Sequence, residues 1–102
     1  MNIALCQVNP IVGAYNYNHD LILKYYKNCI KLNSDIIVFP ELMISGYPPQ
    51  DLLWDEGFVE ENLVILQDII DQSTTPLILG YIRKEGQRLY NSAAVCYNGK
   101  LQ

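Results

Sequence analysis

The stretch Asp35-Ile-Ile-Val-Phe-Pro-Glu-Leu-Met-Ile-Ser-Gly-Tyr-Pro-Pro-Gln-Asp-Leu-Leu53 decides how this chain is organised. Residues 36–39 are consecutively apolar, which predicts a short strand buried on both faces. Pro40 has no amide proton for a sheet ladder, so we expect strand pairing to stop there. Glu41 then places a carboxylate at the carboxyl end of a buried strand, where α/β sheets carry their sites. The turn-rich residues 45–49 redirect the chain and present Tyr47 near the same strand end.

Apolar periodicity along the rest of the chain predicts strands and helices in turn. Two segments carry apolar side chains at three- and four-residue spacing with polar residues between them, which is typical of helices packed on a sheet. We expect Asn18 or Asn16 to cap the first helix. The expected elements are strands at 3–8, 36–39, 76–82 and 89–97, a turn at 84–87, and helices at about 19–32 and 58–72. This order predicts an α/β fold, with two helices on a mixed sheet of about four strands.

Composition limits the class of protein. The chain has 102 residues, 50% of them hydrophobic and eight of them tyrosine, which is more apolar material than a compact domain of this length needs. We therefore expect further chain to cover part of its apolar surface. A net charge of −4 without a basic patch argues against nucleic acid or an anionic membrane as a partner. No apolar run is long enough to span a membrane.

The first residues, Met1-Asn-Ile-Ala-Leu-Cys-Gln7, have neither the charge nor the cleavage site of a secretory signal. Three cysteines scattered through apolar segments argue against a disulfide framework, so we expect a cytoplasmic protein. We interpret Cys6, Cys29 and Cys96 as small buried hydrophobic residues rather than nucleophiles. The cysteines and the single histidine, His19, lack metal-ligand spacing, and the sequence contains no Gly-rich phosphate loop.

Two segments carry a family resemblance. Phe39-Pro-Glu-Leu42 followed by Ser45-Gly-Tyr-Pro-Pro-Gln-Asp-Leu-Leu53 resembles the glutamate motif of the carbon–nitrogen hydrolase (nitrilase) superfamily, and within it the glutaminase domain of glutamine-dependent NAD synthetases. Gln7-Val-Asn-Pro-Ile-Val-Gly13 followed by Asn18 is similar to the start of the same domains, although Ala14 stands where Asp is usual. That departure weakens one capping or turn contact.

The resemblance implies a four-layer α-β-β-α sandwich, of which residues 1–102 form the incomplete N-terminal portion. Enzymes of the superfamily hydrolyse amides with a Glu–Lys–Cys constellation, in which a carboxylate takes the thiol proton and the thiolate attacks the amide carbon. A base is needed because few thiols are ionised at neutral pH, and burial of the carboxylate makes it a better base. Glu41 matches the general base, and Tyr47 matches a position that lines the glutamine pocket. The matching Lys and Cys lie beyond the segments present here, so we expect the 102-residue chain alone to be inactive.

The resemblance also implies partners and cofactors. Glutamine is the expected substrate, and the remainder of the domain and a synthetase domain are the expected partners within a homo-oligomer. We expect no cofactor in this chain, with ATP and Mg²⁺ confined to the synthetase domain. Two alternatives stay open: another amidase of the superfamily, which a substrate panel would identify, and a non-catalytic αβ interaction module, which would pair its apolar sheet face with a partner.

Overall fold

The strands form one mixed sheet whose order in space follows their order in the sequence. In the computed structural model, which describes residues 1–102, the first three strands run parallel and the last two pair antiparallel to their neighbours. The strands are β1 (Ile3–Leu5), β2 (Ile36–Val38), β3 (Leu77–Glu85), β4 (Arg88–Tyr97) and β5 (Lys100–Leu101). The long β3–β4 hairpin turns at Gly86, as predicted from the 84–87 turn signal. Strand β5 has no counterpart among the predicted elements, because two residues carry no periodicity.

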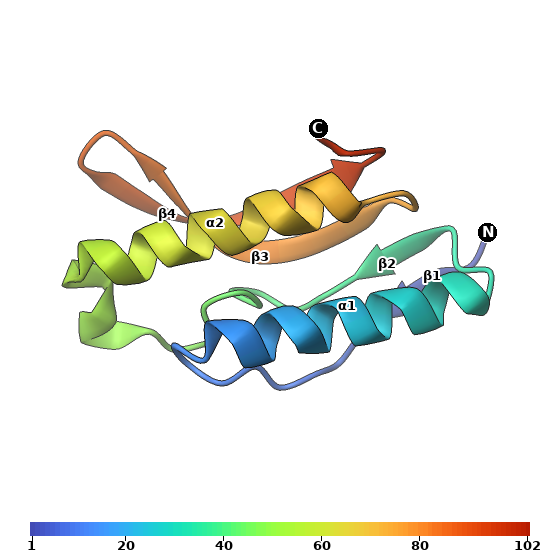
Figure 1. Ribbon diagram of the computed structural model, residues 1–102, viewed down its shortest axis with the longest axis horizontal. Helices are drawn as coiled ribbons and strands as arrows, with labels where there is room; N and C mark the ends of the chain where they lie inside the picture. Colours follow the sequence, from blue (N-terminus) through green and yellow to red (C-terminus); the bar gives the residue numbers. More distant parts are fainter.

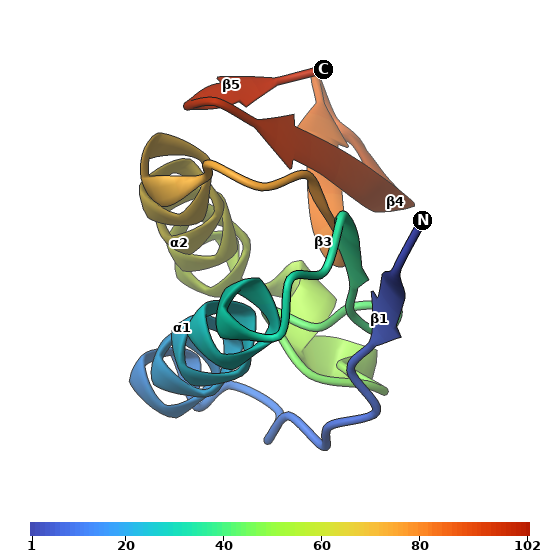
Figure 2. The same ribbon diagram turned by 90° about the vertical axis from the view of Figure 1, so that its right-hand side faces the viewer.

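Two helices cover one face of this sheet, α1 (Tyr15–Lys31) and α2 (Glu56–Gln72), and lie side by side (Figures 1 and 2). A 3₁₀ helix, η1 (Gln50–Trp54), precedes α2. The core fills the space between the helices and the sheet, and its fully buried side chains include Ile22, Ile37, Ile69, Leu77 and Leu79. The predicted α/β class, with two helices on a mixed sheet, is therefore confirmed.

The opposite face of the sheet has no helix over it (Figure 2). Successive residues of a strand point to opposite faces of the sheet. Leu77 and Leu79 are buried against the helices, so their neighbours in the sequence of β3 point away from the helices. We call this side of the sheet the open face. It exposes apolar side chains from β1 and β4: Ile3, Leu5, Leu89, Val95 and Tyr97. In β2, Ile37 is fully buried, whereas Ile36 and Val38 are only half-buried. The prediction of burial on both faces of β2 is thus wrong for the side that α1 and α2 leave open.

The start of α1 differs from its prediction. The helix begins at Tyr15, four residues before the predicted start, and its cap position is Ala14, with no side chain that accepts a hydrogen bond there. Asn18, which we predicted as a cap, is instead fully buried inside the helix and bonds to backbone groups of two other segments. Helix α2 begins at Glu56, where Asp55 is the cap and accepts from the Phe58 amide at 3.2 Å.

Pairing of β2 with β3 continues slightly past the end of β2. The Phe39 amide donates to the Ile78 carbonyl at 2.8 Å, and the Gly80 amide donates to the Pro40 carbonyl at 3.1 Å. Proline lacks a donor but keeps its acceptor, so it ends the ladder with an accepted bond. The predicted stop at Pro40 is therefore confirmed, and the chain leaves the sheet at Glu41. No helix of the structure is both long enough and apolar enough to cross a membrane.

Candidate active site

The backbone of Glu41 crosses the open face of the sheet directly over Gly80 of β3. A Cβ atom on Gly80 would lie 2.6 Å from the Glu41 carbonyl carbon and 2.7 Å from its Cα. Any residue with a Cβ atom at position 80 would clash with the Glu41 backbone, so only glycine permits the crossing. The Gly80 carbonyl also accepts a bond from the Ile44 amide at 3.4 Å, which ties the following turn to the same strand. Gly80 thereby fixes where Glu41 leaves the sheet.

The Glu41 carboxylate is held by one side chain of the sheet. Asn91 of β4 donates from Nδ2 to Glu41 Oε2 at 2.8 Å. No hydrogen bond or ion pair involves the other oxygen, Oε1, and the Glu41 side chain is exposed. A carboxylate can accept about four hydrogen bonds, so Oε1 has lone pairs available for an incoming proton donor. The sequence motif points to Glu41, whereas no local pattern points to Asn91, which lies 50 residues away along the chain.

Glu41 and Asn91 lie at a surface pocket of about 340 Å³. Its polar lining comes from these two side chains and Ser92. Its remaining lining comes from residues 39–40 just after β2, from residues 78–80 in the first half of β3, and from Ala93. The pocket therefore combines an oriented carboxylate with an apolar wall, as small-molecule sites in proteins do.

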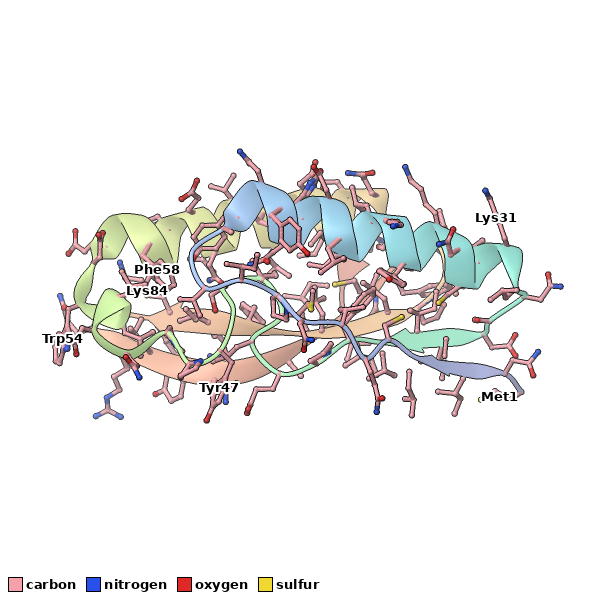
Figure 3. The ribbon with its side chains drawn as sticks, turned by 90° about the horizontal axis from the view of Figure 1, so that it is seen from below. Met1, Lys31, Tyr47, Trp54, Phe58 and Lys84 are labelled. Carbon is pink, nitrogen blue, oxygen red and sulfur yellow. The ribbon has the colours of Figure 1, made fainter.

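Tyr47, the second residue singled out from the sequence, lies on the loop that follows Glu41 but not at this pocket. Its side chain is 62% exposed and lies on the side of the sheet away from the helices (Figure 3). No hydrogen bond joins Tyr47 to Glu41. The next residues line a separate, larger hollow of about 770 Å³ with Val12 and η1: Pro48, Pro49, Gln50, Asp51, Leu52, Trp54 and Asp55. The structure thus places the two predicted residues on one loop without bringing them together.

A buried amide holds this loop in place. Asn18 of α1 bonds to both backbone groups of Ile11, accepting from the amide at 2.8 Å and donating to the carbonyl at 2.9 Å. Its Nδ2 also donates to the Ile44 carbonyl at 2.9 Å. The Gly13 amide donates to the Ser45 carbonyl at 2.9 Å, which joins the same two loops a second time. The loop carrying Glu41 is therefore anchored to α1 through Asn18.

None of the three cysteines lines the pocket of Glu41, and the two buried ones are poor nucleophiles. Cys6 and Cys96 are buried, Cys29 is half-buried, and all three are free thiols. Burial raises the pKa of Cys6 to about 12, with a further contribution from the Cys29 thiol, whose sulfur lies 3.6 Å away. Burial alone raises the pKa of Cys96 to about 11. Because the thiolate is the nucleophile, these shifts keep both groups inert at neutral pH. Their interpretation as buried hydrophobic residues is confirmed for Cys6 and Cys96, while Cys29 keeps partial exposure.

His19 does not take part in the site. It lies in α1 on the helical layer, where Nε2 pairs with Asp68 of α2 and Nδ1 lies 3.3 Å from Asp20. These contacts join the two helices at their outer surface. Nowhere do three or more His, Cys, Asp or Glu side chains gather closely enough to hold a metal ion.

Comparison with known proteins covers nearly the whole chain. The model of the carbon–nitrogen hydrolase family matches residues 2–101. The glutamine-dependent NAD(+) synthetase of Xanthomonas campestris pv. campestris is 35% identical over 104 residues, which cover 100% of this chain and 19% of that protein. The synthetase of the same name from Thermotoga maritima is 31% identical over 104 residues, covering 99% of this chain and 18% of the relative. The chain thus spans about a fifth of the length of these relatives.

Solved structures agree with this comparison. A glutamine-dependent NAD(+) synthetase from Cytophaga hutchinsonii superimposes with a TM-score of 0.92 at 25% identity, over 98% of this chain and 17% of that one. An amidase from Nesterenkonia sp. superimposes with a TM-score of 0.85 at 22% identity, over 100% of this chain and 40% of that one. The second likeness concerns the fold alone: this amidase shares the fold of the chain.

Proposed function

The chain belongs to the carbon–nitrogen hydrolase family, and we propose that residues 1–102 form the N-terminal portion of a glutaminase domain. The proposed reaction is hydrolysis of the side-chain amide of glutamine, and the ammonia released serves NAD synthesis. The support comes from the curated relatives, which are glutamine-dependent NAD synthetases aligned over nearly all of this chain. It also comes from the Glu41 site, which fits the first step of amide hydrolysis.

Glu41 is the proposed general base. Its Oε1 takes the proton of a cysteine thiol, and the thiolate attacks the amide carbon of glutamine. Glu41 then returns the proton to the amide nitrogen as the C–N bond breaks, so ammonia leaves, a thioester remains and the carboxylate is restored. Water hydrolyses the thioester to glutamate and restores the thiol. The observation that carries this role is the hydrogen bond from Asn91 to Oε2, which leaves Oε1 unpaired in a residue that lines the pocket.

The nucleophile and the oxyanion-stabilising lysine are assigned to other parts of the domain. None of the three cysteines lines the pocket of Glu41, and burial raises the pKa of Cys6 and Cys96. Lys100 is an exposed residue of β5 and is paired with Tyr97 of β4. We assign it no catalytic role. We therefore propose that the 102 residues alone release no ammonia from glutamine.

The open face supplies the proposed contact with the remainder of the domain. Its apolar side chains are exposed, and Glu41 emerges on the same face. A layer packed there would bury this apolar surface and cover the carboxylate in one step, which would strengthen Glu41 as a base. Beyond this contact we propose a cytoplasmic homo-oligomer that includes a synthetase domain, where ATP and Mg²⁺ would act.

Ammonia release from glutamine by the full-length protein tests the proposal. We expect activity with glutamine that exceeds activity with simple amides and nitriles. Glu41→Gln should lower kcat by about 10²–10⁴-fold, because the variant loses the proton acceptor. Glu61→Gln, at an exposed position on the helical layer, is the matched control and should leave kcat unchanged. Preference for another amide would replace glutamine as the substrate, and a fully active Glu41→Gln variant would refute the role of the base.

A further inference from the structure

We infer that Asn91 is a positioning residue for the base, holding the Glu41 carboxylate in the orientation that proton transfer requires. The inference rests on the proposed amide hydrolysis, and it adds a residue that acts through Glu41 rather than on the substrate. Its starting point is the 2.8 Å hydrogen bond from Asn91 Nδ2 to Glu41 Oε2, the one polar contact of that carboxylate with the chain.

The sheet explains why Asn91 can reach Glu41. Asn91 is paired with Ile82, and two residues further along β4 Ala93 is paired with Gly80. Paired residues share a face, and so do residues two apart, which puts Asn91 on the same face as the Gly80 position. Glu41 crosses that face over Gly80. The bare Gly80 position therefore brings the carboxylate beside β4, within reach of the first side chain there that can donate a hydrogen bond.

The chemistry of a carboxamide suits this task. A glutamate side chain has three rotatable bonds, and an exposed one samples several rotamers. A single bond to Oε2 reduces this freedom and leaves Oε1 without a hydrogen-bond partner in the chain. The donor is neutral, so it favours the charged form of the carboxylate less than a lysine or arginine would. Glu41 is thus oriented without being neutralised by an ion pair.

The placement of Asn91 predicts an effect on the chemical step rather than on substrate binding. Without the bond, the carboxylate spends less time where Oε1 meets the thiol proton. Misplacement of a reacting group by about 1 Å costs up to about 10²-fold in rate. We therefore expect Asn91→Ala to lower kcat by about 10- to 100-fold and to change KM for glutamine by less than about threefold.

The test uses the full-length protein and three variants of one residue. Asn91→Ala removes the donor, and Asn91→Asp replaces it with a like charge of the same shape, so its kcat should fall at least as far. Asn91→Gln keeps an amide donor on a longer side chain and should recover part of the loss. Asn28→Ala, at an exposed position of α1, is the control that should keep full activity. Thermal unfolding of each variant separates this effect from loss of folded protein.

A double-mutant cycle gives the decisive readout. If Asn91 acts through Glu41, then Asn91→Ala should add almost nothing to the loss already caused by Glu41→Gln. Full additivity of the two losses would overturn the inference, and so would a kcat within twofold of the parent value for Asn91→Ala. An inactive parent protein would overturn both the proposed function and this inference. An active parent with unaffected Asn91 variants would overturn the inference alone.

Discussion

Gly80 and Leu42 lie so close together that a Cβ atom on Gly80 would overlap the Leu42 backbone nitrogen. The same missing side chain accommodates the backbone of Glu41. The approach joins the end of the β2 segment to the middle of β3, and it sets the position from which the carboxylate reaches Asn91. A backbone contact of this kind cannot relax by a change of rotamer, so the geometry of the site depends on the absence of a side chain at Gly80.

Gly80→Ala should therefore displace Glu41 as well as destabilise the fold. Overpacking of a tight site costs about 1–3 kcal/mol, and we expect the upper end because the neighbouring atoms are backbone. Gly86→Ala is the control, since its Cβ would meet nothing within 4 Å and only the left-handed backbone, with φ of 60°, resists the change at about 1 kcal/mol. Denaturant unfolding of both variants checks the order, and an equal or smaller loss for Gly80→Ala would contradict it.

Asn18→Ala should weaken the link between α1 and the loop that carries Glu41. The variant leaves the two Ile11 backbone groups and the Ile44 carbonyl without their partner. An unsatisfied buried polar group costs about 1–3 kcal/mol, so we expect a loss of at least about 2 kcal/mol. Asn28→Ala, an exposed change of the same type in the same helix, should cost almost nothing. Thermal unfolding that shows equal stability for both variants would refute the anchoring role.

Ala14→Asp should stabilise the start of α1. Ala14 occupies the cap position, no side chain accepts from the first turn, and the first turn carries no acidic residue. An aspartate there can accept a hydrogen bond from a free amide and complement the helix dipole, a gain of about 0.5–1 kcal/mol. Ala14→Leu offers no acceptor and serves as the control. An unfolding midpoint of Ala14→Asp at or below that of the parent would contradict the prediction.

The buried thiol of Cys96 should make the fold less stable in alkaline solution. Burial raises its pKa from the ordinary value of 9.0 to about 11. As the pH rises above 9, the unfolded chain loses the thiol proton while the folded chain keeps it, so the free energy of unfolding falls until about pH 11. Below pH 9 the contribution of the thiol is complete and constant. Unfolding midpoints measured from pH 7 to 10.5 should fall less steeply in Cys96→Ala than in the parent, and parallel curves would refute this.

The sequence determined the elements whose signals are local. Apolar runs and helical spacing identified four strands and two helices, and the family pattern around Glu41 identified the carboxylate at a strand end. Local signals gave a wrong start for α1. Asn18 is a residue type that often caps a helix, but it lies one turn inside this one. Elements of two to five residues, β5 and η1, were missed because they are too short to show a period.

The tertiary structure decided the surroundings of the carboxylate. Asn91 reaches Glu41 across 50 residues of sequence, and this contact depends on strand order and register, which no local pattern encodes. In the sequence Gly80 is an ordinary glycine of a predicted strand. Only the structure shows that the Glu41 backbone crosses over it. The sequence by itself therefore singled out Glu41, because the family motif that contains it follows a predicted strand and Pro40. Only the fold fixed what orients it, because hydrogen-bond partners from separate strands meet only after the sheet has assembled.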